Sequence, residues 1–155
     1  MATQYTAGLS SGQVLTAATM NTIGAAGNSY TPAWTASTTN PVIGNGSITG
    51  QWQQINKLVV GQIWIVSGST TTYGTGFYRF SVPLAINANQ FYVGNMQLLD
   101  NSAGFTCYVG AGLPVTSGGT TIEFRTHGAG TFTPTSPITL ASGDQIRIQF
   151  VYEAA

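Results

Sequence analysis

Apolar and polar residues alternate in short runs from residue 30 to the end of the chain, and clusters of Gly, Ser, Thr, Asn and Pro separate the runs. Alternation with a period of two predicts β-strands that bury one face and solvate the other. Because no long helical pattern interrupts the runs, the chain predicts an all-β domain, either an antiparallel sandwich or a barrel. The expected strands are Ile48–Ile55, Leu58–Ser67, Phe77–Val82, Phe91–Leu99, Phe105–Gly112, Thr121–Thr126 and Asp144–Tyr152, with a short edge piece at Pro137–Leu140.

The same alternation separates the two faces of each expected strand. In the run at 144–152, the apolar side chains share one face and Gln145, Arg147 and Gln149 share the other, as in a strand that packs on one side. The run at 58–67 is apolar on both faces and needs two covers. One face holds Leu58, Val60, Trp64 and Val66, and the other holds Val59, Ile63 and Ile65. We expect the set Val59, Ile63 and Ile65 to be the second apolar face, covered by another subunit, with the arm of the same chain as the alternative cover.

Residues 1–29 differ from the rest and predict an arm that precedes a β-domain at 30–155. The stretch Leu15–Gly24 predicts one short helix, with Thr16 as the N-cap and Gly24 as a left-handed stop. Leu15 and Met20 occupy the two positions of a hydrophobic staple. Since two helical turns are unstable alone in water, we expect the arm to dock on a partner or a neighbouring subunit. The candidate anchoring residues are Leu15, Thr16, Met20 and Ile23.

Formal charges are scarce along the whole chain. The 155 residues include 4 Lys+Arg, 4 Asp+Glu and 1 His, and the first charged side chain is Lys57. Charged residues make up 5% of the chain, against about a quarter of an average soluble domain. Because a free monomer normally uses charge to stay dispersed, this composition favours a protein whose surface is largely covered by other protein. The net charge of zero favours neither nucleic acid nor a membrane surface as a partner, and neither a signal peptide nor a membrane helix is expected.

Few side chains could carry catalysis. We expect His127 in an exposed turn, and the strand-like surroundings of Cys107 predict a small buried hydrophobe. The segment Gly8–Gly12 matches the G-x-S-x-G pattern of serine hydrolases, but no strand precedes it, so we attribute the match to chance. The scattered carboxylates give no metal-ligand spacing. The sequence therefore predicts a protein that is not an enzyme and uses no cofactor or metal.

Aromatic residues offer one candidate for ligand binding. Trp52 lies between Gln51 and Gln53, and sugar sites combine an exposed ring with amide or acidic groups that bond to hydroxyls. The alternative for each ring is an ordinary place in the core. Trp52, Gln51 and Gln53 are therefore retained as a candidate glycan contact.

Several segments without a catalytic signature form a recognisable succession of turns and strands. The segment Tyr30–Gly50, which begins Tyr-Thr-Pro-Ala-Trp, continues through Trp52–Val59 and Gly76–Pro83. With the ending Ser142–Ile148, these segments resemble the β-domains of tailed-phage virion proteins, which include minor tail, fibre and head-decoration components. The arm segment Ser11–Asn21 is similar to anchor segments of phage fibre-like proteins. The resemblance implies a jelly-roll-like β-sandwich, usually trimeric, on a phage particle.

Two functional hypotheses follow from the sequence. The first is a trimeric capsid decoration or head-spike protein, made in the bacterial cytoplasm, that docks on the major capsid protein or another virion protein through its arm. It is motivated by an architecture of one arm and one domain. The second is a tail-fibre tip or receptor-binding module that recognises host-surface glycan, and it is motivated by the rings and amides. An enzyme such as a glycan depolymerase is the least favoured alternative, because the chain offers so few titrating groups.

Overall fold

The computed structural model describes residues 27–155, and the predicted helix at 15–24, with its four anchoring residues, lies outside this range. The described residues form strands without a helix. The strands are β1 (Asn28–Tyr30), β2 (Trp34–Ala36), β3 (Ser47–Ile55), β4 (Leu58–Val66), β5 (Tyr78–Ser81), β6 (Gly94–Asp100), β7 (Thr106–Pro114), β8 (Thr121–Thr126), β9 (Gly130–Thr131) and β10 (Gln145–Glu153).

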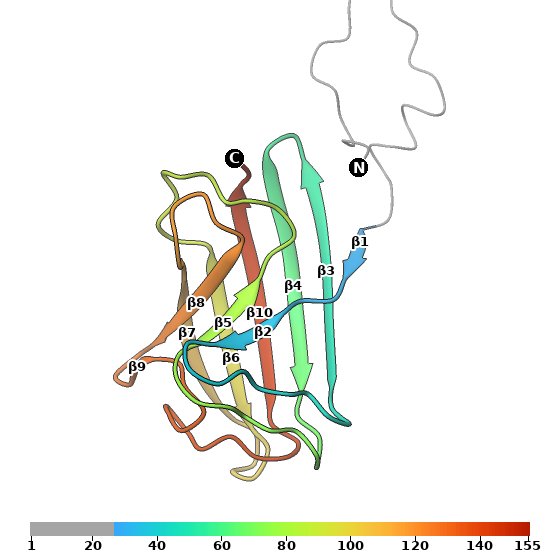
Figure 1. Ribbon diagram of the computed structural model, residues 1–155, viewed down its shortest axis with the longest axis vertical. Helices are drawn as coiled ribbons and strands as arrows, with labels where there is room; N and C mark the ends of the chain where they lie inside the picture. Colours follow the sequence, from blue (N-terminus) through green and yellow to red (C-terminus); the bar gives the residue numbers. More distant parts are fainter. Residues whose placement is uncertain (1–26) are drawn as a thin grey trace, which may run out of the picture.

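All the strands belong to one antiparallel sheet in the order β1-β3-β4-β10-β6-β7-β8-β5-β2, with β9 paired to β8. Figure 1 shows the sheet curling into a half-barrel, so that β8, β5 and β2 cross in front of the long strands β10 and β6. The expected all-β antiparallel class is confirmed. The jelly-roll sandwich is not confirmed, because the strands follow a single hydrogen-bonded path instead of two facing sheets.

The two edge strands of the sheet are neighbours in sequence. β1 pairs with β3 at one edge and β2 pairs with β5 at the other, so the short link between β1 and β2 connects the two edges of the half-barrel. Two contacts to Ser81 of β5 fasten this link: the hydroxyl of Tyr30 donates to the carbonyl of Ser81 at 3.3 Å, and the amide of Ala33 donates to its Oγ at 2.8 Å. The predicted boundary between residues 29 and 30 therefore falls inside β1, and residues from Asn28 onward belong to the sheet.

A long hairpin with a two-residue turn joins β3 to β4. Ile55 pairs with Leu58, so the turn consists of Asn56 and Lys57 alone. Asn56 has a positive φ of 55°, a conformation that Asn adopts more readily than most residues. The segment at 137–140, predicted as an edge piece, forms no strand.

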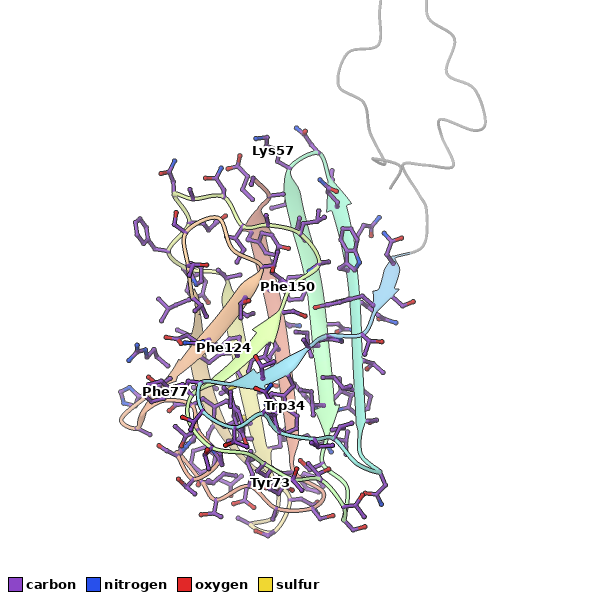
Figure 2. The ribbon with its side chains drawn as sticks, viewed as in Figure 1. Trp34, Lys57, Tyr73, Phe77, Phe124 and Phe150 are labelled. Atoms are coloured by element: carbon purple, nitrogen blue, oxygen red, sulfur yellow. The ribbon has the colours of Figure 1, made fainter. Side chains whose placement is uncertain are left out.

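The core fills the concave side of the curled sheet and is rich in aromatic rings (Figure 2). Tyr78 of β5 packs edge-on against Trp34 and Phe132, with ring centroids 5.1 and 5.0 Å apart. Phe80 and Phe124 form a similar pair at 5.9 Å. Rings from the front strands thus meet the aliphatic side chains of β4, β6 and β10 in one cluster.

The assignment of the two apolar faces of β4 was wrong. Val59, Ile63 and Ile65, expected at a subunit interface, are at most 1% exposed and belong to the core of the single chain. The outward side chains include Leu58, Val60 and Trp64, which are 42–50% exposed. The reason lies in the register. The inner set faces Tyr152, Ile148 and Ile146 across β10, on the face of that strand that turns inward.

Candidate functional site

A row of amide side chains crosses the convex face of the sheet. The register aligns four amide side chains across four adjacent strands: Gln51 of β3 faces Gln62 of β4, which faces Gln149 of β10, which faces Asn95 of β6. We call these residues the amide row. The Nε2 of Gln62 donates to Oε1 of Gln51 at 3.0 Å, and the hydroxyl of Tyr92 donates to Oδ1 of Asn95 at 2.7 Å.

A cation and an aromatic ring lie one row further along the strands. Trp64 faces Arg147 across β4 and β10, and the guanidinium carbon of Arg147 lies 5.7 Å from the ring centroid. Both side chains bond to Gln145: the indole Nε1 donates to Oε1 at 3.2 Å, while Nε and Nη2 of Arg147 donate to the same oxygen at 3.2 and 2.8 Å. These bonds hold the guanidinium against the ring.

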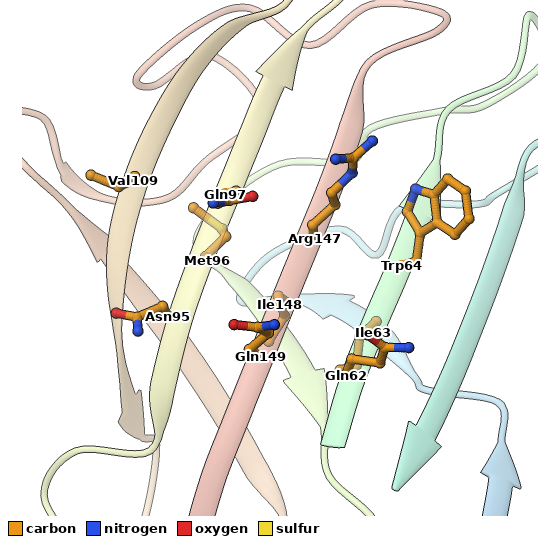
Figure 3. A pocket seen from close by; sticks show the side chains of 10 residues that line it. All are labelled: Gln62, Ile63, Trp64, Asn95, Met96, Gln97, Val109, Arg147, Ile148 and Gln149. Atoms are coloured by element: carbon orange, nitrogen blue, oxygen red, sulfur yellow. The ribbon is translucent and has the colours of Figure 1, made fainter. Parts of the chain in front are cut away.

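Between these two rows the surface is hollowed. A depression of about 510 Å³ lies over β4, β10, β6 and β7, and Figure 3 shows the side chains around it. We call it the Trp64 hollow. Four of its ten lining residues carry amides, and its one ionised side chain is Arg147. The lining residues are Gln62, Ile63, Trp64, Asn95, Met96, Gln97, Val109, Arg147, Ile148 and Gln149.

The other side of the amide row is apolar. Ile55 faces Leu58 in the β3–β4 hairpin, and Val60 faces Val151 of β10. These four side chains, which we call the apolar patch, are 42–59% exposed. A second depression of about 580 Å³ adjoins the patch, and Gly27 lines it together with Ile55, Val60 and Val151. The patch therefore lies close to Gly27, the first residue that the structure describes.

The predicted glycan contact is only partly on this face. Trp52 is 6% exposed and packs in the core, so its ring cannot meet a ligand. Gln51 is exposed and Gln53 is half-buried, both on the convex side of β3. Because alternate residues of a strand point to opposite faces, the two amides and the ring between them could not share a surface. Trp64, which the sequence offered both as an apolar residue of this strand and as one of several rings that could stack on a sugar, is 50% exposed and adjoins the amides.

The lone cysteine also departs from expectation. Cys107 is exposed on β7, so the prediction of a buried small hydrophobe was wrong. It pairs with Leu99 of β6 on the convex face, where the sheet has no second cover. His127 is exposed in the turn after β8, as predicted.

Ionisable groups on the convex face are few and mostly paired with each other. Glu123 of β8 lies 3.9 Å from Arg79 and 3.4 Å from Arg125.

Three tyrosines on the inner side of the sheet have raised pKa values. Burial raises the pKa of Tyr152 to about 12, and it also raises the pKa of Tyr30 and of Tyr78. Within residues 27–155, no cluster of three or more His, Cys, Asp and Glu side chains could hold a metal ion.

The Trp64 hollow and its surroundings therefore combine amides that donate and accept, the Arg147 cation, the Trp64 ring and the neighbouring apolar patch. No helix within the described range is long and apolar enough to cross a membrane. Comparison of the chain with protein-family models, with curated proteins and with solved structures gave no match.

Proposed function

We propose that this protein is a structural subunit of a tailed-phage virion, a trimeric head-decoration or head-spike protein that docks on the shell through residues 1–29. The observation that carries the proposal is the apolar patch on a chain with almost no charge. The resemblance of segments 30–50, 52–59, 76–83 and 142–148 to virion β-domains supports the same class of protein.

The apolar patch suits a second copy of the chain as its cover. Ile55, Leu58, Val60 and Val151 come from three adjacent strands and form one continuous surface. Contiguous exposed aliphatic surface is unusual on a monomer and is typical of subunit interfaces. With a net charge of zero, two copies approach without electrostatic repulsion. A closed three-fold arrangement would cover each patch and stop further growth.

The position of Gly27 supports an anchoring role for the segment that precedes it. Gly27, which follows residues 1–26 in the chain, lines the depression beside the apolar patch and so lies next to the proposed subunit interface. In a three-fold assembly the three arms would then start near one another, which suits attachment at a common site on a shell. The major capsid protein is the proposed partner.

The competing hypothesis, a tail-fibre tip that recognises host-surface glycan, was motivated by rings and amides; of these, Trp52 is buried and does not support it. The virion role is tested by purifying particles from lysates of the host bacterium and assaying each gradient fraction for the protein. We expect the protein to sediment with DNA-filled heads, and a version lacking residues 1–26 to remain at the top of the gradient while still folded. Full-length protein that never sediments with particles would contradict the proposal.

A further inference from the structure

We propose that the Trp64 hollow is a carbohydrate-binding site that takes an acidic oligosaccharide, with Arg147 binding the carboxylate, the amides binding sugar hydroxyls and Trp64 stacking on a sugar ring. This inference goes beyond the assembly role and does not require it, because the hollow and the apolar patch lie on opposite sides of the amide row.

Arg147 is held in place by neutral groups. Its Nε and Nη2 donate to Gln145, and its guanidinium lies over the Trp64 ring. Among residues 27–155, no carboxylate forms a salt bridge with it, whereas Arg79 and Arg125 both pair with Glu123. Residues 1–26 contain no Asp or Glu. The guanidinium is thus positioned without an internal anion, and its Nη1 donors, which do not bond to Gln145, can meet a carboxylate ligand.

The amides supply the hydrogen bonding that sugar hydroxyls need. Gln62, Asn95, Gln97 and Gln149 surround the hollow, and each primary amide offers two donors and a carbonyl acceptor. A hydroxyl group both donates and accepts, so amides fit it better than charged groups of one kind do. All four side chains stand on strands of the sheet, and a site on rigid strands loses little entropy when a ligand binds.

Trp64 provides the apolar surface. The residue is 50% exposed, and Arg147 lies over one face of its ring. The ring also lines the hollow, where it offers apolar surface to the apolar face of a pyranose ring. Figure 3 shows Trp64 and Arg147 side by side on neighbouring strands, so a sugar against the ring would have its carboxylate within reach of the guanidinium.

The low charge of the hollow separates an oligosaccharide from a nucleic acid. Nucleic-acid sites place several cations along a closely charged backbone, and their affinity falls steeply with salt. The hollow has one cation among its lining residues, and the rest of its lining is amide or apolar. A single cation matches an oligosaccharide in which neutral sugar units separate the carboxylates.

The test is a binding screen with the purified full-length protein on an array of uronic-acid and sialic-acid oligosaccharides, each printed beside its carboxyl-reduced neutral counterpart. We expect binding to a subset of the acidic probes, at least tenfold above the reduced forms. Calorimetry on the strongest probe should then show at least a tenfold loss for Arg147→Gln and for Trp64→Ala, and a smaller loss for Arg147→Lys.

Lys57→Gln is the matched control, because it removes one exposed cation from the hairpin turn, away from the hollow. It should bind like the parent protein. Circular dichroism melting of each variant excludes unfolding as the cause of a loss. Equal binding to acidic and reduced probes, unchanged affinity in Arg147→Gln, or equal binding to a single-stranded DNA oligonucleotide would each overturn the proposal. A monomeric variant with an altered apolar patch should keep its affinity, which separates this result from any failure of assembly.

Discussion

The two faces of β4 can be compared by truncating one residue on each. Ile63 is 1% exposed and faces Ile148 across β10, whereas Val60 is 42% exposed on the convex side. Ile63→Ala removes three buried carbon atoms, worth about 0.8 kcal/mol each in transfer free energy, and leaves a cavity besides. The free energy of unfolding should fall by about 2–5 kcal/mol. For a chain of this size that corresponds to a melting temperature lower by about 10 °C.

Val60→Ala should behave differently because its carbon atoms contact solvent in the single chain. Its intrinsic cost should stay within about 0.5 kcal/mol. If sister copies cover the apolar patch, a further loss should appear only through weaker assembly, and it should therefore depend on protein concentration. The assay is thermal unfolding by circular dichroism at several protein concentrations. An equal, concentration-independent loss in both variants would refute the assignment of the faces.

Three further predictions concern other residues. Asp144→Ala should destabilise the fold by about 2–3 kcal/mol in urea unfolding, because the buried carboxylate accepts the backbone amides of Asn101 and Ala141 at 2.9 and 2.8 Å; an undiminished stability would count against this role. Burial raises the pKa of Tyr152 to about 12, whereas the phenol of the unfolded chain titrates at about 10. The free energy of unfolding should therefore fall as the pH rises from 10 through 12, and a stability that rises over that interval would contradict the reasoning. The exposed thiol of Cys107 should react with a chromogenic disulfide reagent in the native protein, and reaction only after denaturation would show that it is covered.

The long strands could be predicted because their signal is local. β8 matches the expected range, β3 and β4 differ from it by one residue at one end, and β10 differs by one residue at each end. The short strands β1, β2 and β9 were missed, since two or three residues are too few to show a period. The order of strands could not be obtained from the sequence. Pairings such as β1 with β3 and β2 with β5 are made by backbone hydrogen bonds between segments that are not adjacent in the chain, and they leave no mark on the residue pattern.

The candidate site was harder to predict than the fold. Alternation along β3 was enough to exclude Trp52 as a partner of Gln51 and Gln53, and that signal was overlooked. The contact between Trp64 and Arg147 could not be predicted from the local pattern, because it depends on the register between β4 and β10. Trp64 and Gln145, which bond to each other, are 81 residues apart in the sequence. The exposure of Cys107 likewise follows from the open convex face of β7 and not from its apolar neighbours.

The mass of the purified protein in solution tests the central claim, that sister copies cover the apolar patch. Sedimentation equilibrium at micromolar concentration should give three times the chain mass of 16.1 kDa, about 48 kDa. Replacing Val60 and Val151 by Asp should yield a folded species of one chain mass, because buried carboxylates without partners would oppose association. A parent protein that remains at 16.1 kDa over the whole micromolar range would contradict the account.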